Sequence, residues 1–194
     1  MTSATRIWGA ASSCSNGSST ATGTQTCNGD GDGIIGRAVG PSSFGELFLF
    51  WKHMENADMI DGNYTGRAGT GSDIHCTTEN SFNSKMQNGL IITFNLDRVI
   101  TGSTTHFDGE YRRNYLQFSG PDPAGTSSPS VPLLTPTETW KIDTKLDDGK
   151  PATGIMNERH WGDCTDATSS TDYTSDYLLT EDNPVCIPVI FGAY

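Results

Sequence analysis

A short acidic and glycine-rich segment, residues 28–35, carries the clearest chemical pattern in the sequence. Asn28, Asp30 and Asp32 place oxygen-bearing side chains at alternate positions. This alternation turns successive oxygens toward one centre, Gly33 in sixth place allows a sharp turn, and the backbone carbonyl of Ile34 can supply a further oxygen. Because oxygen ligands suit a hard divalent cation, we expect Asn28, Asp30, Asp32 and Ile34 to bind calcium.

The match to an EF-hand calcium loop is incomplete. Gly36 and Val39 stand where such a loop has its water-mediated ligand and its bidentate acid. Glu46 comes later and could supply the missing oxygen, although it is equally explained as the acid of a helix capping box. The alternative to a calcium site is a plain Gly/Asp turn, and magnesium is disfavoured because it prefers to keep its waters.

A second acidic cluster contains Asp143, Asp147 and Asp148. Paired carboxylates can act as general acid and base where their surroundings separate their pKa values, but no hydrophobic pocket is indicated here. A helix end in which Asp147 and Asp148 accept local backbone hydrogen bonds explains the cluster better. Since the sequence also has no GxSxG, HExxH, P-loop or dinucleotide-binding motif, we expect a protein without enzymatic activity.

Four of the five cysteines bracket polar stretches that could not order themselves by packing. Cys14 and Cys27 enclose one stretch, and Cys164 and Cys186 enclose another. A disulfide across each loop would contribute about 3 kcal/mol by restricting the unfolded chain. Spacing favours these pairs, but connectivity does not follow from sequence, and Cys76 is either free or a sign of another pairing. Disulfides indicate export to an oxidising compartment.

The composition limits the partners and the setting of the protein. Of 194 residues only 34% are hydrophobic, and the formal net charge is -11. This acidic field repels phosphate backbones, so general nucleic-acid binding is not expected. No apolar run approaches the roughly 20 residues of a membrane span, and no signal sequence is present. We therefore expect that an exported parent protein has lost its N-terminal segment in this chain.

Two helices are expected to hold these segments. Ser43 and Glu46 form a predicted capping box, which an apolar stripe follows, and together they predict a helix at about 44–59. A second box, with the sequence TPTE, has Pro at the first helical position and predicts a helix at about 136–148.

Strands are predicted at residues 90–96, 111–119 and 186–191 from their apolar and β-branched content. Because the strands do not alternate with helices, the order of elements predicts an α+β fold with an antiparallel sheet and long loops. The length favours a single domain over residues 1–194.

Four segments in this order resemble the soluble regions of type IV pilin-like proteins, including minor pilins and pseudopilins. They are residues 4–9, 27–33, 46–54 with 60–66, and 142–154. The last segment, IDTKLDDGKPATG, is the most specific because it is long and unlike a generic helix end.

The resemblance implies a sheet of about four antiparallel strands packed on a helix, and a C-terminal loop bounded by a disulfide where Cys164 and Cys186 stand. It also implies that a prepilin peptidase removes a short leader from the parent protein. An apolar N-terminal helix, absent here, would then anchor the subunit in the inner membrane and later join other pilin subunits in the filament core. Some relatives bind calcium beside the sheet, which adds weight to Asp30 and Asp32.

These features predict a non-enzymatic structural subunit of a type IV pilus, or of a secretion or DNA-uptake pseudopilus, at the cell surface. Calcium and disulfides would order its loops. The alternative is a secreted adhesin module that binds carbohydrate or host surfaces through exposed aromatics, namely Trp161, Tyr173 and Tyr177. A hydrolase that uses Asp147 and Asp148 ranks third.

Overall fold

The computed structural model describes residues 3–14, 21–95, 98–111, 114–159 and 162–192. The chain divides into two compact units. The first unit comprises residues 1–94 and 121–129, and the second comprises residues 95–120 and 130–194. The expectation of a single domain over residues 1–194 stays a prediction.

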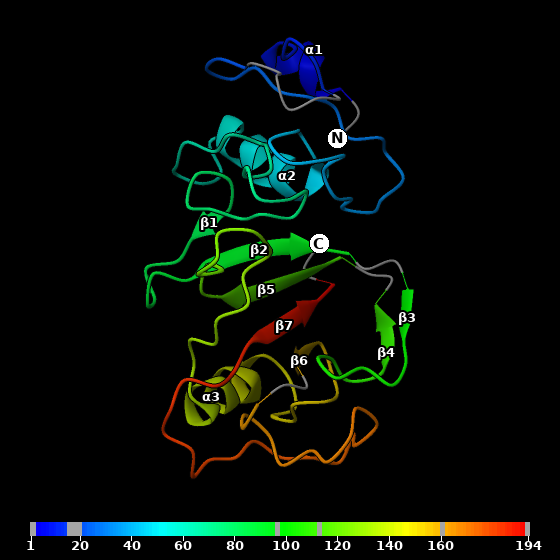
Figure 1. Ribbon diagram of the computed structural model, residues 1–194, viewed down its shortest axis with the longest axis vertical. Helices are drawn as coiled ribbons and strands as arrows, with labels where there is room; N and C mark the ends of the chain where they lie inside the picture. Colours follow the sequence, from blue (N-terminus) through cyan, green and yellow to red (C-terminus); the bar gives the residue numbers. More distant parts are fainter. Residues whose placement is uncertain (1–2, 15–20, 96–97, 112–113, 160–161, 193–194) are drawn as a thin grey trace. The chain divides into compact units, whose positions relative to one another are not determined.

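The helices and strands follow one another as Figure 1 labels them. The first unit contains α1 (Ala4–Trp8), α2 (Glu46–Asn56), β1 (Phe82–Asn83) and β2 (Leu90–Phe94). The second unit contains β3 (Arg98–Ile100), β4 (Gly109–Tyr111), β5 (Tyr115–Ser119), α3 (Pro136–Leu146), β6 (Met156–Glu158) and β7 (Pro188–Phe191).

The sheet topology confirms the α+β class and the antiparallel pairing. Five strands take the order β1-β2-β5-β7-β6, and β3 pairs with β4 in a separate sheet of two strands. Strand β1 pairs with β2, and β7 pairs with both β5 and β6, each time antiparallel. The sheet therefore has five strands where about four were expected, and a pilin-like arrangement stays a prediction.

Helix α2 begins at Glu46, and the capping box predicted from Ser43 and Glu46 is wrong. The N-cap is Gly45, which has no side chain with which to cap the helix. The hydroxyl of Ser43 is engaged elsewhere, because it donates to the carbonyl of Gly40 at 2.5 Å and accepts from the Gly40 N–H at 3.0 Å. A Cβ at Gly45 would lie 2.4 Å from the backbone nitrogen of Ala38, so only glycine fits where the helix starts.

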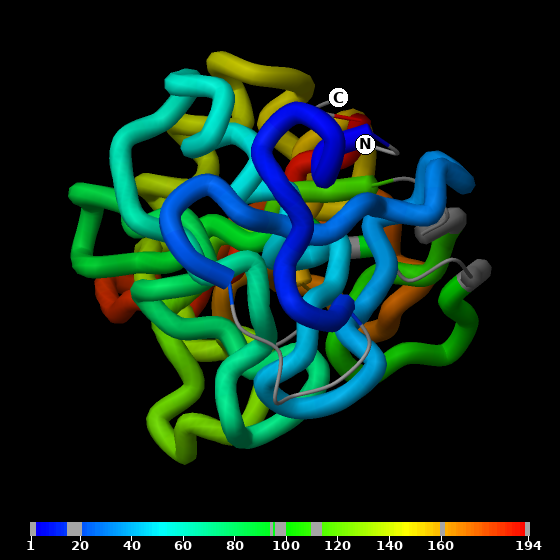
Figure 2. The backbone as a smooth tube through the Cα atoms, turned by 90° about the horizontal axis from the view of Figure 1, so that it is seen from above, coloured from blue at the N-terminus to red at the C-terminus, as the bar shows by residue number. Residues whose placement is uncertain are grey.

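The first disulfide joins Cys14 and Cys27, as the sequence predicts. Cys27 belongs to a buried cluster with Phe44, which precedes α2, and with Leu49 in α2. Residues 9–11 run beside residues 24–27, which Figure 2 shows as two neighbouring blue stretches. The Ala11 N–H donates to the Thr26 carbonyl at 3.0 Å, which ties these stretches together. Cys76 is a buried free thiol, and burial raises its pKa to about 12.

Helix α3 confirms the second capping box. The Thr135 hydroxyl accepts from the Glu138 N–H at 3.2 Å, and the Glu138 carboxylate accepts from the Thr135 N–H at 2.9 Å. The helix ends at Leu146, two residues before the predicted end, because Asp147 leaves helical geometry. Its carboxylate accepts instead from the backbone N–H groups of Ile155 and Met156.

The second disulfide, Cys164–Cys186, is also confirmed and lies in the core of the second unit. Both cysteines are 0% exposed and cluster with Leu134 and Tyr177. Strand β7 begins two residues after Cys186 and lies between β5 and β6 in the sheet. The disulfide therefore anchors the polar loop of residues 165–185 at the start of this strand.

The predicted strands are found with shorter limits. Residues 90–96 give β2, Leu90–Phe94, and residues 186–191 give β7, Pro188–Phe191. The segment 111–119 is split between the end of β4 and β5, Tyr115–Ser119.

Candidate cation-binding loop

Three carboxylates of the first unit come together at the predicted acidic loop. One oxygen each from Asp30, Asp32 and Glu46 lies within 4.8 Å of the other two. Glu46 spans the loop, because its Oε1 accepts from the Asp30 N–H at 2.9 Å and its Oε2 accepts from the Gly36 N–H at 3.2 Å. The capping-box role considered for Glu46 is wrong, and its role as a source of a calcium-binding oxygen stays a prediction.

The two aspartates also form hydrogen bonds within the loop. The Asp32 N–H donates to Asp30 Oδ1 at 3.1 Å, and the Ile34 N–H donates to Asp32 Oδ1 at 2.7 Å. These are Asx turns, and both side chains remain exposed to solvent. Asn28 points elsewhere, because its Oδ1 accepts from the Thr5 N–H at 2.9 Å. Ligation by Asn28 and by the carbonyl of Ile34 stays a prediction.

The three carboxylates lie close enough to repel one another. Their oxygens are within 4.8 Å of one another, and the backbone N–H donors oppose that repulsion. A divalent cation bound to them would oppose it further, and carboxylate oxygens are the ligands that calcium prefers. Asp30 and Asp32 were predicted from the sequence, and Glu46 was considered there either as the source of a missing oxygen or as a capping-box acid.

The acidic loop forms one wall of an apolar groove of about 430 Å³ in the first unit. The opposite wall is the face of α2. The lining residues are Gly29, Gly31, Gly33, Ile34, Ile35, Glu46, Leu49, Phe50, His53, Met54, Ala57 and Met59.

His53 lines this groove as a buried, hydrogen-bonded imidazole. Its Nε2 lies 3.0 Å from the Thr26 hydroxyl and 3.1 Å from the Cys27 carbonyl oxygen. Burial lowers the pKa of His53 to about 4, although the bond to Cys27 opposes this shift. The imidazole is therefore neutral at pH 7, so it brings no positive charge to the groove.

The second acidic cluster serves local structure, as the helix-end interpretation predicts. Asp147 accepts from two backbone N–H groups of the following turn. Asp148 accepts from the Lys150 N–H at 2.9 Å and from the Thr153 hydroxyl at 2.6 Å. Both side chains are thus used to close the turn after α3.

The three aromatic residues named for surface binding differ in their positions. Tyr173 is 44% exposed. Tyr177 is only 5% exposed, which makes its expected surface role wrong: its hydroxyl donates to Asp143 Oδ2 at 2.9 Å, inside the second unit. Trp161 lies outside the described residues.

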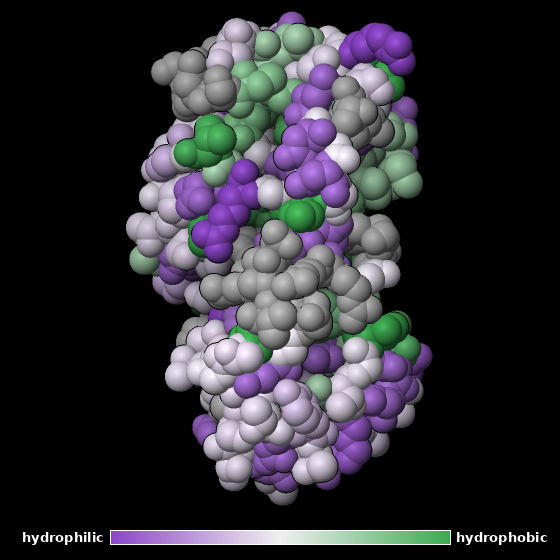
Figure 3. Space-filling view, turned by 90° about the vertical axis from the view of Figure 1, so that its right-hand side faces the viewer, coloured by the Kyte–Doolittle hydropathy of each residue, from purple (hydrophilic) through white to green (hydrophobic). Residues whose placement is uncertain are grey.

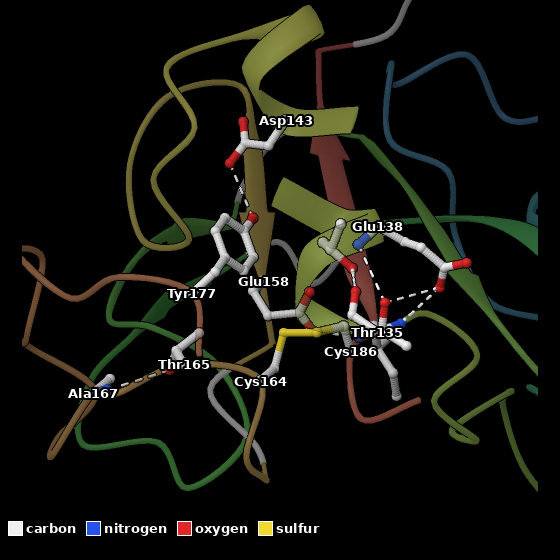
Figure 4. Close-up of a disulfide and its surroundings, with 11 residues drawn as sticks. Thr135, Glu138, Asp143, Glu158, Cys164, Thr165, Ala167, Tyr177 and Cys186 are labelled. Carbon is white, nitrogen blue, oxygen red and sulfur yellow. Dashed lines mark hydrogen bonds between the residues drawn. A yellow bond between two sulfur atoms is a disulfide. The ribbon is translucent and has the colours of Figure 1, made fainter. Parts of the chain in front are cut away.

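A buried carboxyl group, Glu158, lies beside the second disulfide (Figure 4), and no pattern in the sequence predicted it. Glu158 is 1% exposed, and the Ile187 N–H donates to its Oε1. Burial raises the pKa of Glu158 to about 8. A glutamate at the end of a three-residue strand normally faces solvent, so nothing local predicts this burial.

Comparisons with protein-family models, with curated proteins and with solved structures find no match to this chain. Among the described residues, no helix has both the length and the apolar character for crossing a bilayer. The two disulfides indicate an oxidising, extracellular setting.

The low pKa of His53 predicts how its contribution to stability depends on pH. The unfolded chain binds a proton at His53 below about pH 6.5, whereas the folded chain does so only near pH 4. Stability from this residue is therefore lost as pH falls from about 6.5 to 4, by at most about 1.4 kcal/mol per pH unit.

The measurement is the difference in the free energy of urea unfolding between wild type and His53→Gln at pH 7 and pH 5. We expect the wild-type advantage to shrink at pH 5, while other titrating groups cancel in the difference. An NMR titration that places the pKa of His53 near 6.5 would contradict the prediction.

Proposed function

We propose that the chain is a non-catalytic structural subunit of an extracellular filament of the type IV pilus or pseudopilus kind. The observation that carries the proposal is the Cys164–Cys186 disulfide, which closes a long polar loop directly before strand β7. A C-terminal loop bounded by a disulfide at the sheet is what the sequence resemblance implies. The helix α2, which packs beside β2 with the Thr93 hydroxyl 3.3 Å from the Leu47 carbonyl oxygen, also supports it.

The surface is consistent with a hydrated filament exterior. On the face shown in Figure 3, strongly hydrophobic residues form separate green spots among white and purple ones. The most exposed large hydrophobic residues include Val39 at 75%, Met59 at 66% and Ile7 at 61%. Hydrophobic residues scattered singly are normal on soluble surfaces, and they leave the polar loops as the main feature that solvent meets.

Calcium binding by Asp30, Asp32 and Glu46 is the second part of the proposal. Its support is the convergence of three carboxylates within 4.8 Å. Because Glu46 is the first residue of α2, a cation shared with Asp30 and Asp32 would fix the glycine-rich loop against this helix. A loop with so little apolar surface gains order from such a link, because its own packing does not offset the lost chain entropy.

Calorimetric titration of the chelator-treated protein tests the calcium site. We expect saturable binding, and at free calcium 100-fold above Kd an added stability of about 2.7 kcal/mol. Asp32→Asn should weaken binding at least about tenfold, because it removes one of three ligand charges.

The matched control is Asp58→Asn, which removes one exposed acid of the same unit outside the loop. Asp58 has φ 55°, a conformation that Asn also adopts readily. Asp58→Asn should bind calcium as wild type does. Absence of both binding heat and thermal stabilisation on adding calcium would rule out the site.

The filament proposal is tested in the source cell with antibodies to this chain. We expect the chain in the fraction of filaments sheared from the surface, and we expect its loss from that fraction when the prepilin peptidase is deleted. The Cys164→Ser, Cys186→Ser variant should be reduced in the same fraction, because its last loop is no longer fixed.

A second fraction, the soluble culture medium, serves as the control. Chain found only as free protein in the medium, with or without the peptidase, would contradict the filament proposal and favour a secreted binding module.

A further inference from the structure

The Cys164–Cys186 disulfide lies against a buried carboxyl group. One carboxylate oxygen of Glu158 lies within 4.8 Å of both sulfur atoms of this disulfide. Both cysteines are 0% exposed and Glu158 is 1% exposed. Figure 4 shows the Glu158 side chain pointing to the sulfur–sulfur bond from strand β6.

Only one oxygen of this carboxyl group is used in a hydrogen bond. The Ile187 N–H donates to Oε1, whereas Oε2 is buried and has no hydrogen-bond partner among the described residues. Leaving a buried carboxyl oxygen unpaired costs free energy comparable to a lost hydrogen bond or more. The group therefore needs an explanation other than stability.

The proton affinity of Glu158 is matched to that of a thiol. Burial raises its pKa to about 8, although the N–H groups of Ile187 and Arg159 and the charge of Arg159 oppose the shift. Asp143 on α3 adds a smaller raising effect. An ordinary cysteine thiol, with a pKa of about 8.5, would give its proton to Glu158 at little cost, and a buried thiol of higher pKa would do so only as its sulfur forms the new bond.

A buried thiol in this protein needs such a group. Burial raises the pKa of the free Cys76 to about 12, and the thiolate is the form that attacks a disulfide. Cys164 and Cys186 are at least as buried as Cys76. Without a base at hand, their last thiol would ionise rarely at neutral pH.

We propose that Glu158 is the proton acceptor and donor for closing and opening the Cys164–Cys186 disulfide. Before closure, one cysteine is held in a mixed disulfide with an external small-molecule thiol, and the other is a thiol. The Glu158 carboxylate takes the proton of that thiol as its sulfur forms the bond to the partner cysteine. The bond to the external sulfur breaks, and its electron pair leaves with the external thiolate.

The electrons and the proton are balanced in this exchange. Closure takes two exchange steps: the first forms the mixed disulfide, and the second forms Cys164–Cys186. Together they take two electrons from the two cysteines, and the external small-molecule disulfide, which is the oxidant, gains them. In the reverse direction an external thiolate attacks the disulfide, and protonated Glu158 gives its proton to the departing cysteine sulfur.

The test is reoxidation of the full reduced chain in a glutathione redox buffer between pH 6 and pH 9. Free thiols are trapped by alkylation, and peptide mass spectrometry follows each disulfide separately. We expect Glu158→Gln to slow closure of Cys164–Cys186 at least about tenfold at pH 7, the low side of what a positioned base contributes. The difference should narrow between pH 8 and pH 9, where the Glu158 carboxylate is already ionised while the thiolate in the variant still increases with pH.

Two controls separate this role from a structural one. Closure of Cys14–Cys27 in the same molecules should be equal in wild type and Glu158→Gln. Asp143→Asn removes another buried carboxyl group of the second unit and should leave the closing rate of Cys164–Cys186 within about twofold of wild type. Equal closing rates of Cys164–Cys186 in wild type and Glu158→Gln would overturn the proposal.

The wild-type pH profile keeps the test decisive even if Glu158→Gln does not fold. Closure by thiol ionisation alone falls about tenfold for each pH unit below the thiol pKa. Closure that depends on the Glu158 carboxylate should level off above its pKa of about 8, whereas closure by a buried thiol alone keeps rising with pH. We therefore expect the Cys164–Cys186 rate to level off above pH 8. A rate that still rises about tenfold from pH 8 to pH 9 would also overturn the proposal.

Discussion

The second unit depends on one covalent constraint, the Cys164–Cys186 disulfide. Its sulfur atoms are part of the core with Leu134 and Tyr177, and strand β7 begins two residues later. The two cysteines are 22 positions apart in the sequence, across mostly polar chain, and closing such a loop is worth about 3 kcal/mol of unfolded-state entropy. Because domains of this size are stable by only about 5–15 kcal/mol, this contribution is a large share of the total.

The first unit also has long loops with little apolar surface, and a different set of contacts holds them in place. The Cys14–Cys27 disulfide fixes the N-terminal stretch, and Glu46 fixes the acidic loop from the first turn of α2. The cores of both units also contain buried polar groups. Burial lowers the pKa of His53 to about 4 and raises the pKa of Glu158 to about 8, since it disfavours the charged form of each.

Features that depend on neighbouring residues were easier to predict from the sequence than features that depend on residues far away along the chain. The box at Thr135 and Glu138 formed as expected, but the same pattern at Ser43 failed because close approach to Ala38 decides where α2 starts. The disulfide pairs followed from the polar stretches that they enclose. The burial of Tyr177 could not be predicted, because it depends on Asp143, 34 residues away. Strand β6 was missed for a similar reason, since its three residues are held by pairing with β7.

Amide hydrogen exchange in wild type and in Cys164→Ala, Cys186→Ala tests whether the disulfide orders the last loop. The Leu178 N–H, bonded to the Cys164 carbonyl at 3.0 Å, reports on this loop. The Leu47 N–H, bonded to the Gly36 carbonyl at 3.0 Å, is the reference in the first unit. We expect protection of Leu178 to fall by about 100-fold, the equivalent of about 3 kcal/mol, while Leu47 is unchanged. Unchanged protection of Leu178 would contradict the dependence of the second unit on this disulfide.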